Sequence, residues 1–136
     1  MNDISERRLN ANLSSRKLRS NDEFFDWLTG KWFDSSAPMG PYVVTADEIP
    51  DPAQFVVRAF LNGDKVQEAP ATAMVHSVGE TLSYISQILC LEPGDIVSMG
   101  TPAGVGLARG RLLQDGDLIE CEVEGIGRLT NRVVAV

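Results

Sequence analysis

The sequence has only one histidine and two cysteines, the side chains that most often bind zinc. Cys90 and Cys121 belong to no CxxC pair and to no Cys/His cluster, so a zinc site is not expected. A free cysteine commonly behaves as a small hydrophobic residue. We therefore expect two free thiols in a reducing, cytoplasmic setting.

Long hydrophobic runs are also missing. No apolar stretch approaches the roughly 18 residues of a membrane-spanning helix, and the N-terminus lacks the layout of a signal peptide. Basic residues are a minority: the net charge is −7, and lysines and arginines concentrate between Arg7 and Arg19, a stretch interpreted as a solvated loop. Because nucleic-acid binding depends on neutralising phosphates, neither nucleic acid nor a membrane is expected as a partner.

Two short helices are predicted, near residues 21–29 and 78–90. Each begins at a serine with a glutamate three residues on, which is the capping-box pattern, in residues 20–23 and 77–80. The second predicted helix also has an apolar stripe at helical spacing, formed by Val78, Leu82, Ile85 and Leu89.

Six segments of mostly β-prone residues are predicted as short strands: 42–45, 54–61, 65–67, 95–99, 117–123 and 129–134. Asn62 and Gly63 can close a tight hairpin, although Asp64 can lengthen the turn. Two helices among these strands indicate a β-rich α+β fold. The length of 136 residues is enough for one domain, residues 1–136, with a hydrophobic core.

The segment from Glu92 to Gly106 carries the strongest indication of a binding site. A Pro-Gly turn leads into a short apolar run that ends in a loop with Gly100, Thr101 and Gly104. Glycine allows positive φ angles and close approach, so this loop can direct N–H groups and the threonine hydroxyl at a small anion. A GxxxxGK[ST] nucleotide loop is not matched, because leucine and alanine follow Gly106. A purely structural turn is the alternative.

Several segments in a fixed order resemble the fumarylacetoacetate hydrolase family. The glycine loop is similar to the family's GDxxxxGTPAGVG signature. Four further regions resemble family motifs: residues 2–7 (NDxSxR), 31–41 (KSFD followed by APLGP), 44–52 (VTADEIPDP) and 62–67 (NGExxQ). The resemblance extends over nearly the whole chain, which is identified as the C-terminal portion of the family's catalytic domain.

The resemblance implies a mixed β-roll or sandwich fold and chemistry on small oxo-acids. Family members hydrolyse acylpyruvates or fumarylacetoacetate, decarboxylate β-keto acids or isomerise hydroxymuconate-type dienes, through an enolate that binds one divalent ion. The implied cofactor is Mg²⁺ or Mn²⁺, with Ca²⁺ as a further option. The implied assembly is a homodimer.

The same resemblance assigns roles to five residues. Asp3 matches the third carboxylate ligand of the metal. Lys31 matches a lysine that contacts carboxylate or enolate oxygens of the substrate, and Gly100 with Thr101 matches the loop that receives a substrate carboxylate. Asn10 stands where relatives often have a longer glutamine that touches the substrate. By residue type alone, Asp3 is a frayed terminus and Lys31 a favourable cation at a helix end.

Other charged residues are interpreted as structural. Arg7 is expected in an ion pair, and His76 is expected beside the second helix cap. Glu120 and Glu122 spell ExE, the motif of the family's other two metal ligands, but they lie in the wrong place and follow strand alternation. They are interpreted as a solvent-facing edge.

The family's ExE segment precedes the region that matches here, as does the His/Glu pair that activates water in several members. We therefore expect this chain to need two further carboxylates and a general base before it can act as a metal-dependent oxo-acid enzyme. The alternative is a truncated, inactive remnant or an interaction module that keeps the fold and the dimer surface.

Overall fold

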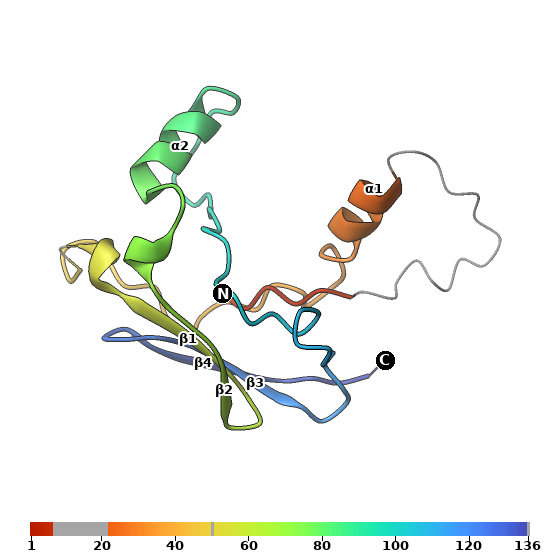
Figure 1. Ribbon diagram of the computed structural model, residues 1–136. Coiled ribbons are helices and arrows are strands. Elements are labelled where there is room, and N and C mark those ends of the chain that lie inside the picture. Colours follow the sequence, from red (N-terminus) through yellow and green to blue (C-terminus); the bar gives the residue numbers. More distant parts are fainter. Residues whose placement is uncertain (7–21, 50, 136) are drawn as a thin grey trace. The chain divides into compact units, whose positions relative to one another are not determined.

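The computed structural model describes residues 1–6, 22–49 and 51–135, which form two compact units, Met1–Tyr42 and Val43–Val136. The first unit contains α1 (Asp22–Thr29). The second contains the remaining elements of Figure 1, which are η1 (Pro52–Gln54), β1 (Val56–Leu61), β2 (Asp64–Pro70), η2 (Ala71–Ala73), α2 (Val78–Ser86), β3 (Leu118–Val123) and β4 (Gly127–Arg132). No described helix has both the length and the apolar character to cross a membrane.

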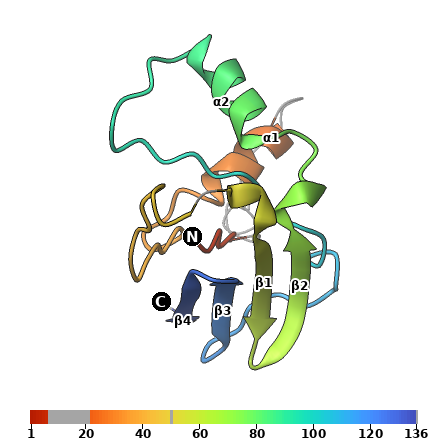
Figure 2. The same cartoon turned by 90° about the vertical axis from the view of Figure 1, so that its left-hand side faces the viewer.

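The four strands form one antiparallel sheet in the order β2-β1-β3-β4, as Figure 2 shows. A two-residue turn joins β1 to β2, and its residues Asn62 and Gly63 have φ angles of 52° and 88°. Positive φ at both positions is the type I′ geometry that Asn-Gly favours. The predicted tight hairpin is therefore confirmed, and Asp64 pairs with Leu61 instead of lengthening the turn.

The pairing of β1 with β2 skips one residue. Ala59 lies opposite Gln67, and Phe60 lies opposite Lys65, so Val66 is the extra residue of a β-bulge. A bulge residue stands outside the regular ladder. The Val66 backbone is thereby presented to a segment beyond the sheet.

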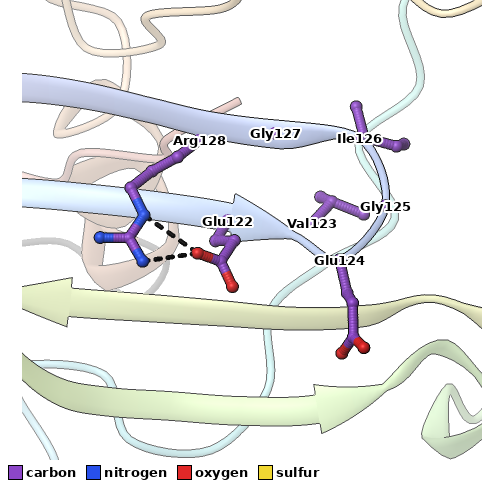
Figure 3. A pocket seen from close by; sticks show the side chains of 7 residues that line it. All are labelled: Glu122, Val123, Glu124, Gly125, Ile126, Gly127 and Arg128. Carbon is purple, nitrogen blue, oxygen red and sulfur yellow. Dashed lines mark hydrogen bonds and ion pairs between the residues drawn. The ribbon is translucent and has the colours of Figure 1, made fainter.

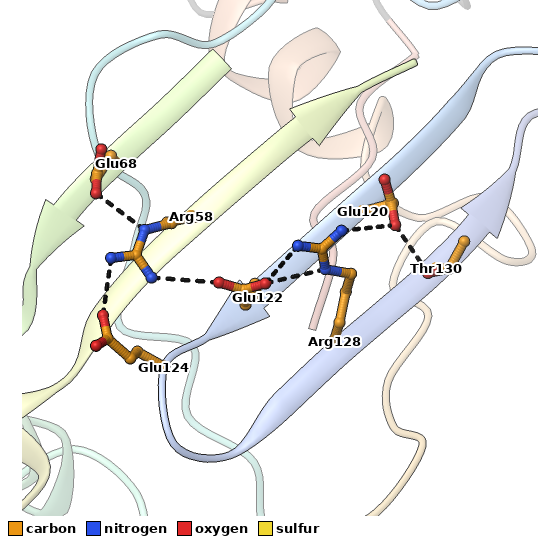
Figure 4. A network of polar contacts seen from close by, with 7 residues as sticks. All are labelled: Arg58, Glu68, Glu120, Glu122, Glu124, Arg128 and Thr130. Carbon is orange, nitrogen blue, oxygen red and sulfur yellow. Dashed lines mark hydrogen bonds and ion pairs between the residues drawn. The ribbon is translucent and has the colours of Figure 1, made fainter. Parts of the chain in front are cut away.

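One face of the sheet is charged. Arg58 on β1 and Arg128 on β4 bind the carboxylates of Glu68, Glu120, Glu122 and Glu124 (Figure 4). Hydrogen bonds from Arg128 hold the pKa of Glu122 below its ordinary value. The predicted edge position of Glu120 and Glu122 is wrong, because β3 is a central strand flanked by β1 and β4. Their side chains are 15% and 24% exposed between arginines from those neighbours.

The opposite face of the sheet is apolar. It carries Ala59 and Leu61, the two hydrophobic residues that are buried in the described part of the chain. Cys121 pairs with Ala59, and burial raises the pKa of its thiol. The buried apolar core of the described residues is small, because one sheet face is charged and α2 contributes no buried residue. Cys90 and Cys121 are both free, as predicted.

Both predicted helices are present. α1 lies within the predicted range, and its predicted cap at Ser20 lies outside the described residues. The capping box of α2 is confirmed: Ser77 Oγ accepts from the Glu80 N–H at 3.2 Å, and the Ser77 N–H donates to Glu80 Oε2 at 2.8 Å. α2 ends at Ser86 rather than at residue 90. None of the predicted apolar stripe is buried: Val78 and Ile85 are half-buried, and Leu82 and Leu89 are exposed.

Two of the six predicted strands are wrong. Residues 42–45 and 95–99 belong to no ladder among the described residues, and the Asp95 N–H instead donates to the Glu92 carbonyl at 3.1 Å in a turn. A strand needs a second segment to pair its N–H and C=O groups, and the composition of one segment does not reveal that partner. The other four predicted strands correspond to β1–β4, which confirms the β-rich α+β class.

Candidate functional site

Residues 1–6 run beside residues 30–38 within the first unit. Three backbone N–H groups donate across at 2.8 to 3.0 Å, from Asn2, Ile4 and Glu6 to the carbonyls of Pro38, Ser36 and Gly30. A Cβ atom on Gly30 would lie 2.5 Å from the Glu6 carbonyl oxygen, so only glycine allows this approach. The segment is held along its length, which excludes the interpretation of Asp3 as a frayed terminus.

The Lys31 ammonium is the centre of a polar cluster in this unit. Its Nζ atom lies 2.5 Å from Asp3 Oδ2 and 3.0 Å from Ser5 Oγ. It also lies 5.4 Å from the centroid of the Trp27 ring, within the range of a cation–π contact. The side chain of Lys31 is 20% exposed and that of Asp3 is 47% exposed, so a ligand can reach the pair from solvent. Two of the predicted site residues are therefore in direct contact.

The glycine loop of the second unit is held by the side chain of Gln67 on β2. Gln67 Nε2 donates to the Pro102 carbonyl at 2.6 Å and to Thr101 Oγ1 at 3.0 Å, with the Ala103 carbonyl at 3.5 Å. Gly100 and Gly104 have φ angles of 93° and 105°, a region that favours glycine. The loop therefore has a defined attachment to the sheet.

Close backbone contact reinforces that attachment. A Cβ atom on Gly104 would lie 2.2 Å from the carbonyl oxygen of Val66, the bulge residue of β2. It would also lie 3.1 Å from Cγ of Gln67. The β-bulge and the glycine thus fit each other, while the predicted approach of an anion to this loop stays a prediction.

Sequence analysis missed a buried carboxylate at the start of β3. Asp117, whose side chain is 7% exposed, accepts hydrogen bonds from Asn62 Nδ2 (2.8 Å), the Gln114 N–H (2.7 Å) and Arg111 Nη2 (2.9 Å to each oxygen). These bonds, led by that from Asn62, hold the pKa of Asp117 below its ordinary value. Asp117 thereby ties the β1–β2 turn to β3. Asn62 is 55 positions away, so no local pattern indicates the pair.

The predicted site residues are divided between the two units. Asp3 and Lys31 lie in the first unit, whereas Gly100 and Thr101 lie in the second. Their convergence on one substrate stays a prediction. Asn10 lies outside the described residues.

Arg7 and His76 are both predicted to have structural roles. Arg7, predicted in an ion pair, lies outside the described residues. His76 is exposed immediately before the α2 cap.

A hollow of about 350 Å³ lies at the β3–β4 hairpin, lined by Glu122, Val123, Glu124, Gly125, Ile126, Gly127 and Arg128 (Figure 3). All three of its charged side chains are already paired: Arg128 Nη2 lies 2.5 Å from Glu122 Oε2, and Glu124 is bound by Arg58. None of the predicted site residues lines it. This hollow is a feature of the hairpin and not the candidate site.

A divalent metal does not fit the described residues alone. Mg²⁺ and Mn²⁺ favour several oxygen ligands, commonly carboxylates and water. Within residues 1–6, 22–49 and 51–135, no three acidic, histidine or cysteine side chains gather to form such a site. Asp3 offers one carboxylate, and one of its oxygens is bonded to Lys31.

Comparison with known proteins gives a family match over almost the whole chain. The family model described as "Fumarylacetoacetate (FAA) hydrolase C-terminal" matches residues 1–134. The mitochondrial oxaloacetate tautomerase Fahd2a of Rattus norvegicus is 41% identical over 110 residues, which are 79% of this chain and 35% of that protein. The chain thus spans less than half the length of this relative.

Solved structures of the same kind share the fold. The fumarylacetoacetate hydrolase of Exiguobacterium antarcticum is 38% identical with a TM-score of 0.77, over 85% of this chain and 42% of that one. The maleylpyruvate hydrolase of Sphingobium sp. SYK-6, in complex with manganese(II) and pyruvate, is 33% identical with a TM-score of 0.72. That match covers 78% of this chain and 38% of the hydrolase.

Proposed function

The chain belongs to the fumarylacetoacetate hydrolase family, and from that premise we propose that it supplies the oxyanion-binding part of a metal-dependent enzyme acting on small 2-oxo acids. The observation that carries this proposal is the Lys31–Asp3 contact on a segment pinned by backbone hydrogen bonds. The relatives named for oxaloacetate and maleylpyruvate support the substrate class. Both compounds are 2-oxo acids that carry carboxylates and can enolise.

Lys31 stabilises negative charge that develops on a substrate oxygen. When a 2-oxo acid loses a C3 proton, the electron pair moves to the carbonyl oxygen and forms an enolate. A positioned ammonium near that oxygen lowers the barrier without needing to reorganise. Asp3 and Ser5 hold the Lys31 Nζ atom in place, and the 20% exposure of the lysine side chain limits screening by water.

Thr101 and the Gly100 backbone hold the substrate carboxylate. The loop presents a hydroxyl and a glycine with a positive φ angle, which is a geometry suited to binding a small anion. A fixed carboxylate determines where the rest of a small substrate lies. The loop therefore orients the substrate relative to the charge-stabilising lysine, provided that both units face one site.

Asp3 is proposed as one ligand of a divalent ion whose other ligands are carboxylates outside the described residues. The ion would act as a Lewis acid on the oxo group. Mg²⁺ and Mn²⁺ are the proposed ions, with Ca²⁺ as a further option, and the manganese complex of the maleylpyruvate hydrolase supports this class. The chain alone should therefore bind Mn²⁺ weakly.

The test reconstitutes the site by adding a segment with an ExE motif, fused or as a second polypeptide. Calorimetry then measures Mn²⁺ binding, and absorbance follows the enol form of oxaloacetate and the cleavage of acylpyruvates. Mn²⁺ should bind more tightly to the complex than to the chain alone, and at least one reaction should appear in the complex while the chain alone turns over negligibly. Lys31→Met should lower kcat/KM by about a hundredfold, the usual effect of removing one oxyanion donor. Asp3→Asn should weaken Mn²⁺ binding.

Lys65→Met is the matched control, because Lys65 is also ion-paired to a carboxylate but lies on the charged face of the sheet. It should leave both measurements unchanged. The proposal is wrong if the reconstituted complex turns over no oxo-acid. It is equally wrong if the complex is indifferent to Lys31→Met and Asp3→Asn.

We also propose that the active form is a homo-oligomer, with a homodimer as the expected state. The support is exposed apolar surface on and after α2, at Leu82, Tyr84, Ile88 and Leu89. Surface of this kind commonly marks a contact with another protein.

A further inference from the structure

We propose that Gln67 is a positioning residue that fixes the Thr101 hydroxyl as a hydrogen-bond donor to an anionic group of the substrate. The inference deepens the proposed function and rests on it, because it concerns the same loop. It adds a residue on β2, outside the glycine signature. Gln67 lies 34 positions before Thr101, directly after the bulge residue Val66, and its side chain forms a hydrogen bond with Thr101.

The two ends of the Gln67 amide can be told apart by their neighbours. The carbonyl oxygen of Pro102 lies 2.6 Å from one amide atom, and the carbonyl oxygen of Ala103 lies 3.5 Å away. Carbonyl oxygens only accept hydrogen bonds, so the amide atom that faces them must be the NH₂ group. The opposite orientation would place three oxygens against one another.

The direction of the Thr101 hydrogen bond follows from that assignment. The same NH₂ group lies 3.0 Å from Thr101 Oγ1, and it donates, so the threonine oxygen accepts. A hydroxyl carries one proton of its own, and that proton must then point away from Gln67. Among the described residues, no group accepts a hydrogen bond from the Thr101 hydroxyl, and Thr101 is exposed, so its proton is available to a ligand oxygen. Gln67 thus turns a group that could accept or donate into a donor.

The bulge on β2 brings the Val66 carbonyl into contact with the glycine loop. Val66 is the extra residue, and its carbonyl oxygen is so close to Gly104 that a Cβ atom there would lie at 2.2 Å. The neighbouring residues Val66 and Gln67 of β2 thus both hold the loop, the first by backbone contact with Gly104 and the second by side-chain hydrogen bonds. Both contacts are present without a ligand, so the loop conformation is preorganised for binding.

The first test needs no ligand. NMR spectra of the full chain are compared with those of Gln67→Met and of the control Gln87→Met, whose exposed glutamine follows α2. In the unmodified chain, the Gln67 NH₂ protons should show contacts with the Thr101 methyl group. Gln67→Met should shift the backbone amide resonances of Gly100, Thr101, Ala103 and Gly104, and Gln87→Met should not. Unchanged loop resonances in Gln67→Met overturn the inference.

The second test is a double-mutant cycle on binding. Pyruvate is titrated into the full chain, with loop resonances as the readout. Gln67→Met and Thr101→Val should each weaken binding by about tenfold, as expected for a lost hydrogen bond to a charged group. The double variant should be no weaker than Thr101→Val, because Gln67 acts through Thr101. Thr101→Ser should retain most of the affinity.

The outcomes separate the two proposals. Additive losses in the cycle refute Gln67 as a positioning residue, even if pyruvate binds well and the proposed function stands. Absence of saturable pyruvate binding by the unmodified chain counts against the anion-binding role of the loop. In that case the ligand-free spectra still decide whether Gln67 sets the loop.

Discussion

Replacing Gly104 by alanine tests whether the loop depends on its contact with the bulge. Gly94 provides a matched control, because Gly94 and Gly104 both have a φ angle of 105°. A Cβ atom on Gly94 would meet nothing within 4 Å, whereas one on Gly104 would lie 2.2 Å from the Val66 oxygen. The difference between the two alanine variants therefore isolates the close approach.

The magnitudes follow from these geometries. Alanine at a positive φ angle should cost each variant about 1–2 kcal/mol of unfolding free energy. At Gly104 the loop must also retreat by at least 0.8 Å to reach the 3.0 Å below which Cβ contacts essentially do not occur. That retreat lengthens and weakens the bonds from Gln67 to Thr101 and Pro102, which are 3.0 and 2.6 Å long and worth about 0.5–1.5 kcal/mol each. Gly104→Ala should therefore lose up to about 3 kcal/mol more than Gly94→Ala.

Urea unfolding of the full chain and its two variants measures the difference through the transition midpoint at constant slope. NMR should show shifted backbone amides at Gly100, Thr101 and Ala103 only for Gly104→Ala. Equal destabilisation of the two variants, with unmoved loop resonances, would refute the reasoning. Such a result would mean that the loop does not rest on β2.

Three further predictions concern other parts of the chain. Asp117→Asn should destabilise the fold by about 2 kcal/mol at pH 7, as judged by urea unfolding, because one of its acceptors becomes a donor facing donors. The pKa of Asp117 is lowered in the folded state, so its contribution to the free energy of unfolding is full above the unfolded pKa of about 3.9 and is lost as pH falls through the folded pKa. The stability difference between the unmodified chain and Asp117→Asn should therefore shrink in acid. A difference that does not depend on pH would contradict this assignment. Gly30→Ala should detach residues 1–6, seen as faster hydrogen exchange at Ile4 and Glu6, whereas Gly79→Ala, with open space at its Cβ position, should leave that exchange unchanged. Leu82→Glu should shift sedimentation toward the monomer, and an unmodified chain that is monomeric at tens of micromolar, a rough working range for weak association, would count against the proposed oligomer.

Local patterns predicted the elements whose causes are local. The serine and glutamate of the α2 capping box lie three positions apart, and the Asn62-Gly63 turn depends on the φ angles of those two residues. Alternation identified the strand that became β3. Residues 95–99 have a similar composition but no described partner, so that prediction failed. The composition of a segment indicates that it can form a strand, but only the tertiary structure shows which other strand it pairs with.

The candidate site shows the same division. Family motifs identified Asp3, Lys31 and Thr101, and Asp3 and Lys31 are in contact across 28 positions. Gln67 was visible as part of a motif, but its hold on the loop was not. Asp117 was missed altogether, because its partner Asn62 lies 55 positions away.

The sequence by itself determined the family, the two helices, the hairpin turn and the glycine loop, because each depends on residues a few positions apart or on a motif read in order. The tertiary structure decided which charges meet, where the bulge places the Val66 carbonyl, and how Gln67 holds Thr101. Those outcomes depend on register and on the antiparallel order of four strands, in which a shift of one residue exchanges the charged and the apolar face. Information of that kind is a property of the assembled sheet and of no single segment.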